Sequence, residues 1–229
     1  MELDYKKNLE KIFDIKISDK NINLFKTALT HTSASQNVDE NYERLEFLGD
    51  AVLKLCVSEI LYKLYPDYTE GSLSKIRSIV VSDNALSTLC DSLAINELIV
   101  LSAQEEKMGG RNKQSIKACV FEALLGAFYL CGEFKSIEAF LKENLLELIK
   151  EVDENFAKYN SKEVLQEYTQ GLRKTLPVYR VIDEQGPPHD KTFTVEVIFD
   201  GKVIAQGTGK TKREAEKQAA YVACKNLNV

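Results

Sequence analysis

The spacing of the apolar residues changes along this chain of 229 residues, and the change divides it into two parts. Over the first 150 residues apolar side chains recur three and four positions apart, which is typical of amphipathic helices. After residue 176 they alternate with polar ones, as in Phe193, Val195 and Val197, which is the period of a strand. The sequence therefore predicts an all-α domain followed by a small α+β domain.

The first part predicts three long helices and no strand before residue 176. They cover 42–65, 115–131 and 136–151. Pro66 and Gly132 are the residues that stop the first two. The polar segment 153–160 has no sustained apolar face, so we interpret it as a linker between a domain over 1–152 and a domain over 161–229.

The second part predicts the order α-β-β-β-α. Its elements are a helix over 162–170, strands over 178–182, 193–199 and 203–206, and a helix from 211 to about 227. Gly171 ends the first helix, and Asp200-Gly201 forms a hairpin turn. Thr211 and Glu214 have the spacing of a capping box, which predicts the start of the last helix.

Composition excludes several classes of protein. The longest apolar stretch near the middle, 120–131, contains Glu122 and is too short to span a bilayer, and residues 1–7 lack the apolar core of a signal peptide. The five cysteines include no CxxC pair and there are only two histidines. We therefore expect reduced thiols in a cytoplasmic protein, with no disulfide framework, no zinc knuckle and no membrane partner.

The net charge of −5 is unevenly divided. Residues 160–229 hold 11 lysines and arginines against 9 acidic residues, whereas the preceding residues hold 19 against 26. A small basic unit thus follows a larger acidic one. Because a local basic patch governs binding to polyanions, the overall charge does not exclude a nucleic-acid partner.

Three carboxylates share one ridge of the first long helix. At about 100° per residue, Glu43, Glu46 and Asp50 fall within about 60° of one another. The residues expected on the opposite, core-facing side are Leu45, Leu48, Val52, Leu55 and Cys56. Such a ridge is either a solvated acidic face or a site where a cation or a basic partner neutralises the repulsion between carboxylates.

Two residues of the same helix favour the second interpretation. Gly49 costs about 1 kcal/mol relative to alanine inside a helix, which is tolerated where another group approaches the backbone closely. Phe47 lies on the acidic side, away from the core residues, so it is expected to contact a partner surface. A second subunit is the simplest such partner.

The second long helix carries Glu122 among small residues. Ala118, Cys119 and Gly126 lie on the same face, which lets another helix come close. Because a buried carboxylate without a partner is costly, we expect Glu122 to meet Glu46 and Asp50. Hard oxygen ligands with open positions suit Mg²⁺, and that arrangement is typical of metal-assisted phosphodiester hydrolysis.

These motifs resemble those of the ribonuclease III family. The signature is Glu43-Arg44-Leu45-Glu46-Phe47-Leu48-Gly49-Asp50, together with Ala28-Leu29-Thr30-His31, Glu70-Gly71 and Phe121-Glu122-Ala123-Leu124-Leu125-Gly126. Residues 161–229 resemble a double-stranded-RNA-binding domain. The resemblance implies a homodimeric endonuclease that processes ribosomal and messenger RNA precursors and leaves 5′-phosphate and 3′-hydroxyl ends.

The resemblance also assigns roles within the nuclease domain. Asp50 and Glu122 are the expected catalytic residues, and with Glu46 they are expected to bind Mg²⁺, for which Mn²⁺ can substitute. Glu43 and Glu70 match supporting acidic positions, and Phe47 matches a residue that plugs into the partner subunit.

Cys119 departs from the family, which usually has aspartate at this position. A thiol suits Mg²⁺ poorly, so Cys119 is either a weakened metal ligand or a small packing residue. The departure keeps a second hypothesis open, a regulator that binds duplex RNA but cleaves it poorly.

Candidate RNA contacts fall in three segments of the second domain. They are Gln166, Glu167 and Gln170 on its first helix, the turn that contains His189, and Lys210, Lys212 and Arg213 at the start of its last helix. The helix dipole and free backbone N–H groups add to the positive charge at that start, which favours phosphate.

The nuclease domain contains further basic residues of open role. Lys54 lies one turn after Asp50 and either offsets negative charge or touches RNA. Lys107, Arg111 and Lys113 surround Gly109-Gly110, in a loop that either grips RNA or is simply solvated.

Overall fold

The computed structural model describes residues 2–156, 160–187 and 190–229. They divide into two compact units, Met1–Lys150 and Glu151–Val229, which we describe separately. The predicted turn at 186–189 can therefore be followed only as far as Pro187, because Pro188 and His189 lie outside the described residues.

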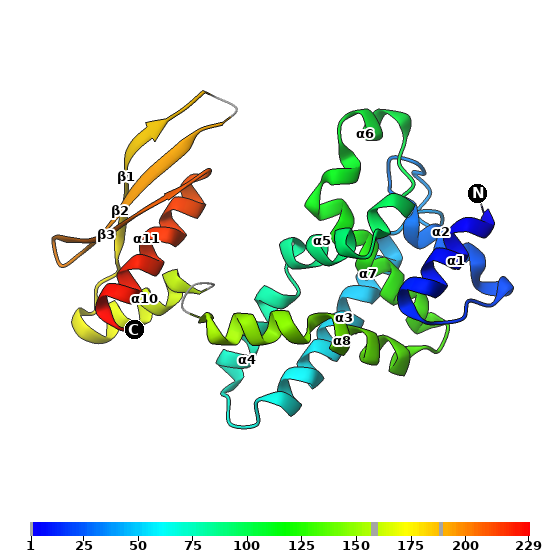
Figure 1. Ribbon diagram of the computed structural model, residues 1–229, viewed down its shortest axis with the longest axis horizontal. Coiled ribbons are helices and arrows are strands. Elements are labelled where there is room, and N and C mark those ends of the chain that lie inside the picture. The colour runs from blue at the N-terminus through cyan, green and yellow to red at the C-terminus, as the bar shows by residue number, and fades with distance from the viewer. Residues whose placement is uncertain (1, 157–159, 188–189) are drawn as a thin grey trace. The chain divides into compact units, whose positions relative to one another are not determined.

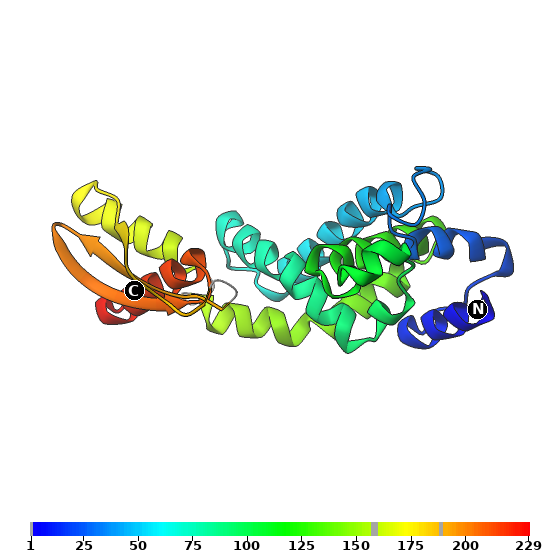
Figure 2. The ribbon, with the colours of Figure 1, turned by 90° about the horizontal axis from the view of Figure 1, so that it is seen from above.

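The first unit consists of helices and short turns (Figures 1 and 2). Its α-helices are α1 (Glu2–Phe13), α2 (Ile22–Leu29), α3 (Glu43–Leu64), α4 (Glu70–Val80), α5 (Asp83–Ser92), α6 (Ala103–Lys107), α7 (Gln114–Leu130) and α8 (Phe134–Glu154). Short 3₁₀ turns cover Asp19–Asn21, Ile95–Leu98 and Gly110–Asn112. Within the described part of this unit the only β-type pairing is an isolated bridge between Thr30 and Val100, so the absence of strands is as predicted.

Helix α7 is the centre of the first unit because it is apolar on almost every side. From Val120 to Phe128 each of its residues is buried except Glu122. Helix α3 packs along it, and α5 is held to it by an ion pair of 2.6 Å between the buried Lys117 of α7 and Asp91. A helix that is hydrophobic all round belongs in the middle of a unit, and this one fixes where α3 and α5 can lie.

The predicted core-facing side of α3 is wrong at one residue. Leu55 is 57% exposed, whereas Leu53, which the pattern did not select, is fully buried. The contact with α7 runs along Leu45, Gly49 and Leu53, four residues apart, and so the buried face is rotated towards them. As a result the acidic ridge borders α7 rather than lying opposite the core.

The second unit has the predicted order α-β-β-β-α. Its elements are α10 (Ser161–Arg173), β1 (Val178–Gln185), β2 (Thr192–Phe199), β3 (Lys202–Gly209) and α11 (Lys212–Leu227). The sheet is antiparallel in the order β1-β2-β3, with Tyr179 opposite Val197 and Val197 opposite Ala205. Both helices cover the same face of the sheet, where Leu165 of α10 and four alanines of α11 complete the core (Figure 1).

Four elements extend beyond their predicted ends. Helix α10 continues through Gly171 to Arg173 and ends where Lys174 takes a left-handed conformation, with φ of 55°. Strands β1 and β3 extend beyond the predicted runs to Gln185 and Gly209, because backbone pairing continues where the apolar alternation stops. Helix α8 continues to Glu154, into the segment that we interpreted as linker.

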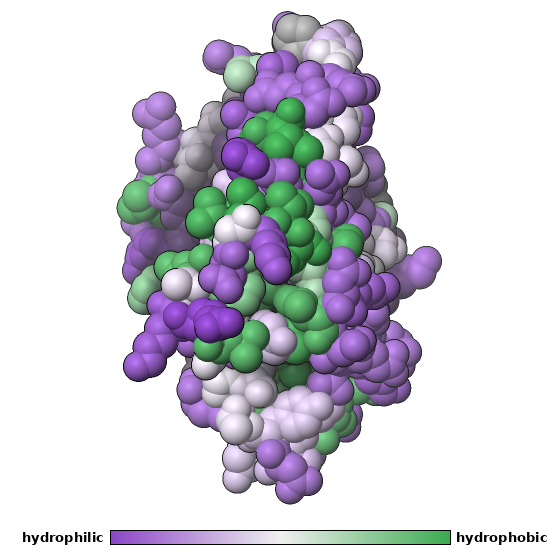
Figure 3. Space-filling view, turned by 90° about the vertical axis from the view of Figure 1, so that its left-hand side faces the viewer, coloured by the Kyte–Doolittle hydropathy of each residue, from purple (hydrophilic) through white to green (hydrophobic). Residues whose placement is uncertain are grey.

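Apolar side chains also remain on the surface. Figure 3 shows them gathered among hydrophilic residues on one face of the molecule. The exposed apolar residues of the second unit are Leu172, Leu176, Val178, Val181, Ile182, Val203 and Val229. None of the described helices is long and apolar enough to cross a membrane.

Candidate active site

Helices α3 and α7 cross at two glycines, and this crossing builds the site. A Cβ atom at Gly49 would lie 1.7 Å from the carbonyl oxygen of Glu122, and one at Gly126 would lie 2.3 Å from that of Leu45. Each glycine thus touches the backbone of the other helix, which explains why Gly49 is tolerated inside α3. The close approach brings Glu122 beside Glu46 and Asp50.

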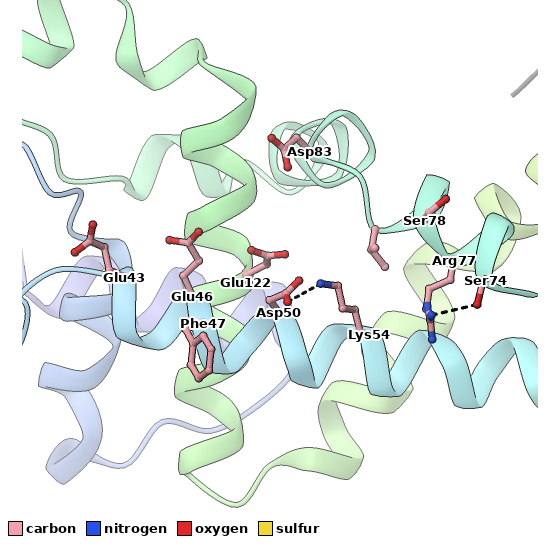
Figure 4. A pocket seen from close by; sticks show the side chains of 11 residues that line it. Glu43, Glu46, Phe47, Asp50, Lys54, Ser74, Arg77, Ser78, Asp83 and Glu122 are labelled. Carbon is pink, nitrogen blue, oxygen red and sulfur yellow. Dashed lines mark hydrogen bonds and ion pairs between the residues drawn. The ribbon is translucent and has the colours of Figure 1, made fainter. Parts of the chain in front are cut away.

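A pocket of about 920 Å³ opens along this crossing. Its acidic residues are Glu43, Glu46 and Asp50 of α3, Asp83 of α5 and Glu122 of α7. In Figure 4 the α3 carboxylates stand in a row on one side of the helix, and Glu122 reaches towards Asp50 from behind it. The structure therefore brings together four acidic residues that the sequence analysis selected.

Glu122 is the carboxylate most affected by this environment. Burial raises its pKa to about 8, and the negative charges of Asp50 and Glu46 act in the same direction. At neutral pH its side chain therefore holds a proton most of the time. A cation in the pocket would relieve both the burial cost and the repulsion.

Asp50 already has a basic partner. Lys54, one turn further along α3, lies with its Nζ 2.7 Å from Oδ2 of Asp50 (Figure 4). This favours the reading in which Lys54 offsets negative charge. No three histidine, cysteine, aspartate or glutamate side chains of the described residues are arranged to hold a metal ion.

Cys119 is half-buried on α7, one turn before Glu122. Burial raises the pKa of its thiol to about 12, and the neighbouring Glu46 carboxylate acts in the same direction. The thiol is therefore neutral, which favours a packing role over that of a metal ligand.

Two other expected residues lie apart from the carboxylate row. Phe47 is 83% exposed at the rim of the pocket, and its ring points away from the carboxylates (Figure 4). Glu70 lies outside this pocket, in a neighbouring groove lined by Leu55, Tyr62 and Leu73 among others. Its Oε1 accepts a hydrogen bond of 2.8 Å from Ser74, which, like Arg77, lines both the pocket and the groove.

The sequence analysis missed Asp83 and Arg77, which also line the pocket. Asp83 follows the helix cap Ser82, and a Ser-Asp pair at a helix start signals only capping. Arg77 lies two turns after Glu70 on α4. This spacing predicts that the two residues share a face of α4, but it does not predict that α4 packs against α3. Only the packing of α4 and α5 against the α3–α7 pair connects them to the site.

The basic loop before α7 is tied to its own acidic residues. Arg111 donates to both carboxylate oxygens of Glu106, at 3.0 and 2.6 Å, and to the carbonyl oxygen of Asn96 at 2.6 Å. Lys113 pairs with Glu105 at 2.6 Å. These bonds favour a folded, solvated loop for this segment, while Lys107 is exposed.

The candidate RNA contacts of the second unit lie on its surface. Gln166, Glu167 and Gln170 are all exposed on α10. At the other helix, Thr211 Oγ1 accepts from the backbone N–H of Glu214, so the predicted cap is present. His189 lies outside the described residues.

The basic residues at the start of α11 are exposed, but two are paired with acidic residues of the hairpin between β1 and β2. Lys210 lies 2.6 Å from Asp190 and Lys212 lies 3.3 Å from Glu184. Lys212 also stands 5.6 Å from the centre of the Phe193 ring. Arg213 has no ion-pair partner among the described residues.

Comparison with known families gives two matches. Residues 21–149 match the model described as Ribonuclease-III-like, and residues 161–227 match the double-stranded RNA binding motif. The ribonuclease 3 of Borreliella afzelii is 41% identical over 218 residues, covering 93% of this chain and 89% of that protein. The ribonuclease 3 of Streptococcus pneumoniae is 42% identical over 224 residues, covering 93% and 92%.

Solved structures agree for the first unit. The nuclease domain of ribonuclease III from Campylobacter jejuni, described with structural flexibility in a region involved in dimer formation, is 36% identical. The structural match covers 62% of this chain and 96% of that domain, with a TM-score of 0.57.

Proposed function

The chain belongs to the ribonuclease III family of double-stranded-RNA endoribonucleases, and we propose that Mg²⁺ is its metal and that the α3–α7 pocket is its cleavage site. The observation that carries the proposal is the meeting of Glu46, Asp50 and Glu122 at the glycine crossing. The proposed products have 5′-phosphate and 3′-hydroxyl ends. The proposed substrates are ribosomal and messenger RNA precursors, in the cytoplasm.

The donor set of the pocket fits such a metal. Carboxylate oxygens are the hard ligands that Mg²⁺ prefers, and Mn²⁺ accepts them as well. The raised pKa of Glu122 supports this fit, because a bound cation would favour the ionised form of that carboxyl. When bound, Mg²⁺ would activate a water molecule and stabilise the negative charge that develops on the phosphate.

Different residues of the chain would bind the metal, shape the pocket and bind the RNA duplex. Glu46, Asp50 and Glu122 would hold the metal after their side chains turn towards it, and Asp50 would exchange Lys54 for the metal. Cys119, whose thiol is neutral, would pack beside Glu46 without binding the metal. Glu43 and Asp83 add negative charge at the rim of the pocket. The second unit would hold the duplex through Gln166, Glu167, Gln170, Lys210, Lys212 and Arg213, with His189 in the adjoining turn.

The direct test is a cleavage assay on a long synthetic RNA duplex with a titration of Mg²⁺. We expect short products with staggered ends at millimolar Mg²⁺ and none in EDTA, because chelation removes the cation that would offset the negative charge developing on the phosphate. As a control, Lys212→Ala with Arg213→Ala should raise the RNA concentration needed for half-maximal rate and leave the rate at saturation near normal. An intact duplex at every Mg²⁺ concentration would overturn the proposal.

We further propose that two copies of the first unit pair through the surface around Phe47. An aromatic side chain that is 83% exposed beside a pocket is costly in water and is covered by a partner in a stable assembly. Phe47→Glu should therefore shift the protein from dimer to monomer in sedimentation at micromolar concentration. Leu172→Glu introduces the same charge at an exposed apolar residue of the second unit, and it should leave the dimer intact. A dimeric Phe47→Glu protein would contradict this interface.

A further inference from the structure

The pocket has two ends of opposite charge. One end holds the carboxylates, among them Glu46 and Glu122. The other end, where α4 meets α3, holds the cations Lys54 and Arg77 (Figure 4). In this structure Lys54 is paired with Asp50. In the described residues no carboxylate lies within 4.0 Å of the Arg77 guanidinium, so its charge is uncompensated at ion-pair distance.

Two serine hydroxyls hold Arg77 in place. Its Nη1 donates to Ser58 Oγ at 2.7 Å and its Nη2 donates to Ser74 Oγ at 3.3 Å. Each hydroxyl has only one proton, and each donates that proton to an acceptor other than Arg77. Ser58 donates to the carbonyl oxygen of Lys54 at 2.5 Å, and Ser74 donates to Glu70 at 2.8 Å. Both oxygens must therefore accept from Arg77.

This anchoring fixes the guanidinium without neutralising it. A carboxylate partner would have held Arg77 equally well but would have cancelled its charge, as Glu106 does for Arg111. Neutral acceptors keep the charge available, and three of the five N–H groups stay free for another ligand. Glu70, which lies outside the pocket, contributes by fixing the proton of Ser74.

We propose that Arg77 binds a phosphate of the RNA strand that enters the cleavage pocket, next to the phosphodiester held at the carboxylate end. This inference rests on the proposed function and adds a substrate-binding residue to it. The planar fork of arginine matches two phosphate oxygens, and its anchored geometry lowers the entropy lost on binding. The cationic end of the pocket would thus set the register of the strand relative to the carboxylates.

The experiment measures duplex binding by the full chain as a function of salt, with Ca²⁺ in place of Mg²⁺ and with cleavage checked on the same samples. Each lost phosphate contact lowers the slope of log K against log salt by about 0.9. Arg77→Gln should therefore reduce the slope by about two in a dimer and weaken binding about tenfold. Arg77→Lys should restore most of the slope but not the cleavage rate, since it keeps the charge and loses the fork.

The matched control is Arg111→Gln, which removes the same charge from the same unit. Because Arg111 is committed to Glu106 and Asn96, this change should lower the melting temperature and leave the salt slope unchanged. If Arg77→Gln behaves in the same way, Arg77 is a structural anchor and the inference is wrong. If the wild-type chain does not cleave duplex RNA in Mg²⁺, the proposed function itself fails, whatever the slopes.

Discussion

Glu122→Gln is expected to lower the rate of duplex cleavage in Mg²⁺ on the order of 10³-fold while leaving duplex binding nearly unchanged. The amide keeps the size of the side chain at the α3–α7 crossing but cannot supply an anionic ligand. The measurement is single-turnover cleavage at saturating protein, with binding followed in Ca²⁺. Glu143→Gln, on the exposed side of α8, is the matched control and should cleave normally.

Stability gives this prediction a second readout. The folded pKa of Glu122 is about 8 against an ordinary value of 4.5, so between these values the folded protein holds a proton that the unfolded chain has lost. Stability of the wild-type protein therefore falls as pH rises through this interval. Glutamine does not ionise, so the variant should be at least as stable as wild type at pH 8 in EDTA. Near-normal cleavage by the variant would remove Glu122 from the site.

Gly49→Ala is expected to destabilise the first unit by about 3 kcal/mol and to abolish cleavage with it. The added methyl would lie 1.7 Å from the Glu122 carbonyl oxygen and 2.5 Å from its carbonyl carbon, which are backbone atoms that no rotamer change can move. The helices must separate, and Glu122 then moves away from Glu46 and Asp50. Thermal unfolding and the cleavage rate, measured on the same samples, would record both losses.

Gly171→Ala is the natural control for that substitution. Gly171 also lies inside a helix, α10, but a Cβ atom there meets nothing within 4 Å. Alanine at this position should stabilise α10 by about 0.5–1 kcal/mol through its helix propensity. If Gly49→Ala behaves like Gly171→Ala, the crossing is looser than described and the glycines do not set the distance between α3 and α7.

The sequence predicted the parts of this molecule that depend on local pattern. Helical spacing gave the shared ridge of Glu43, Glu46 and Asp50, and the capping box gave the start of α11. Gly49 was predicted to allow a close approach, and the approaching group is the backbone of α7. Glu122 was expected to meet the ridge because a buried carboxylate needs partners, which the shared pocket confirms.

The remaining features depend on how helices pack, which spacing within one helix does not record. Leu55 is exposed because the contact with α7 turns the buried face of α3 towards Leu53. Arg77 joins the site because α4 folds back against α3, and the role proposed for it depends on which acceptors receive the Ser58 and Ser74 protons. Gly171 does not end α10, because one glycine costs a helix only about 1 kcal/mol and the left-handed residue that ends this helix is Lys174.

The ion pairs at the start of α11 bear on turnover. Lys210 and Lys212 already have carboxylate partners in Asp190 and Glu184, so under the proposed function each exchanges a partner when a duplex arrives. The displaced carboxylates then stand close to the RNA backbone and repel it. Asp190 and Glu184 therefore compete with RNA phosphates for the two lysines, which weakens the binding of cut RNA. Weaker binding of the product favours its dissociation after cleavage.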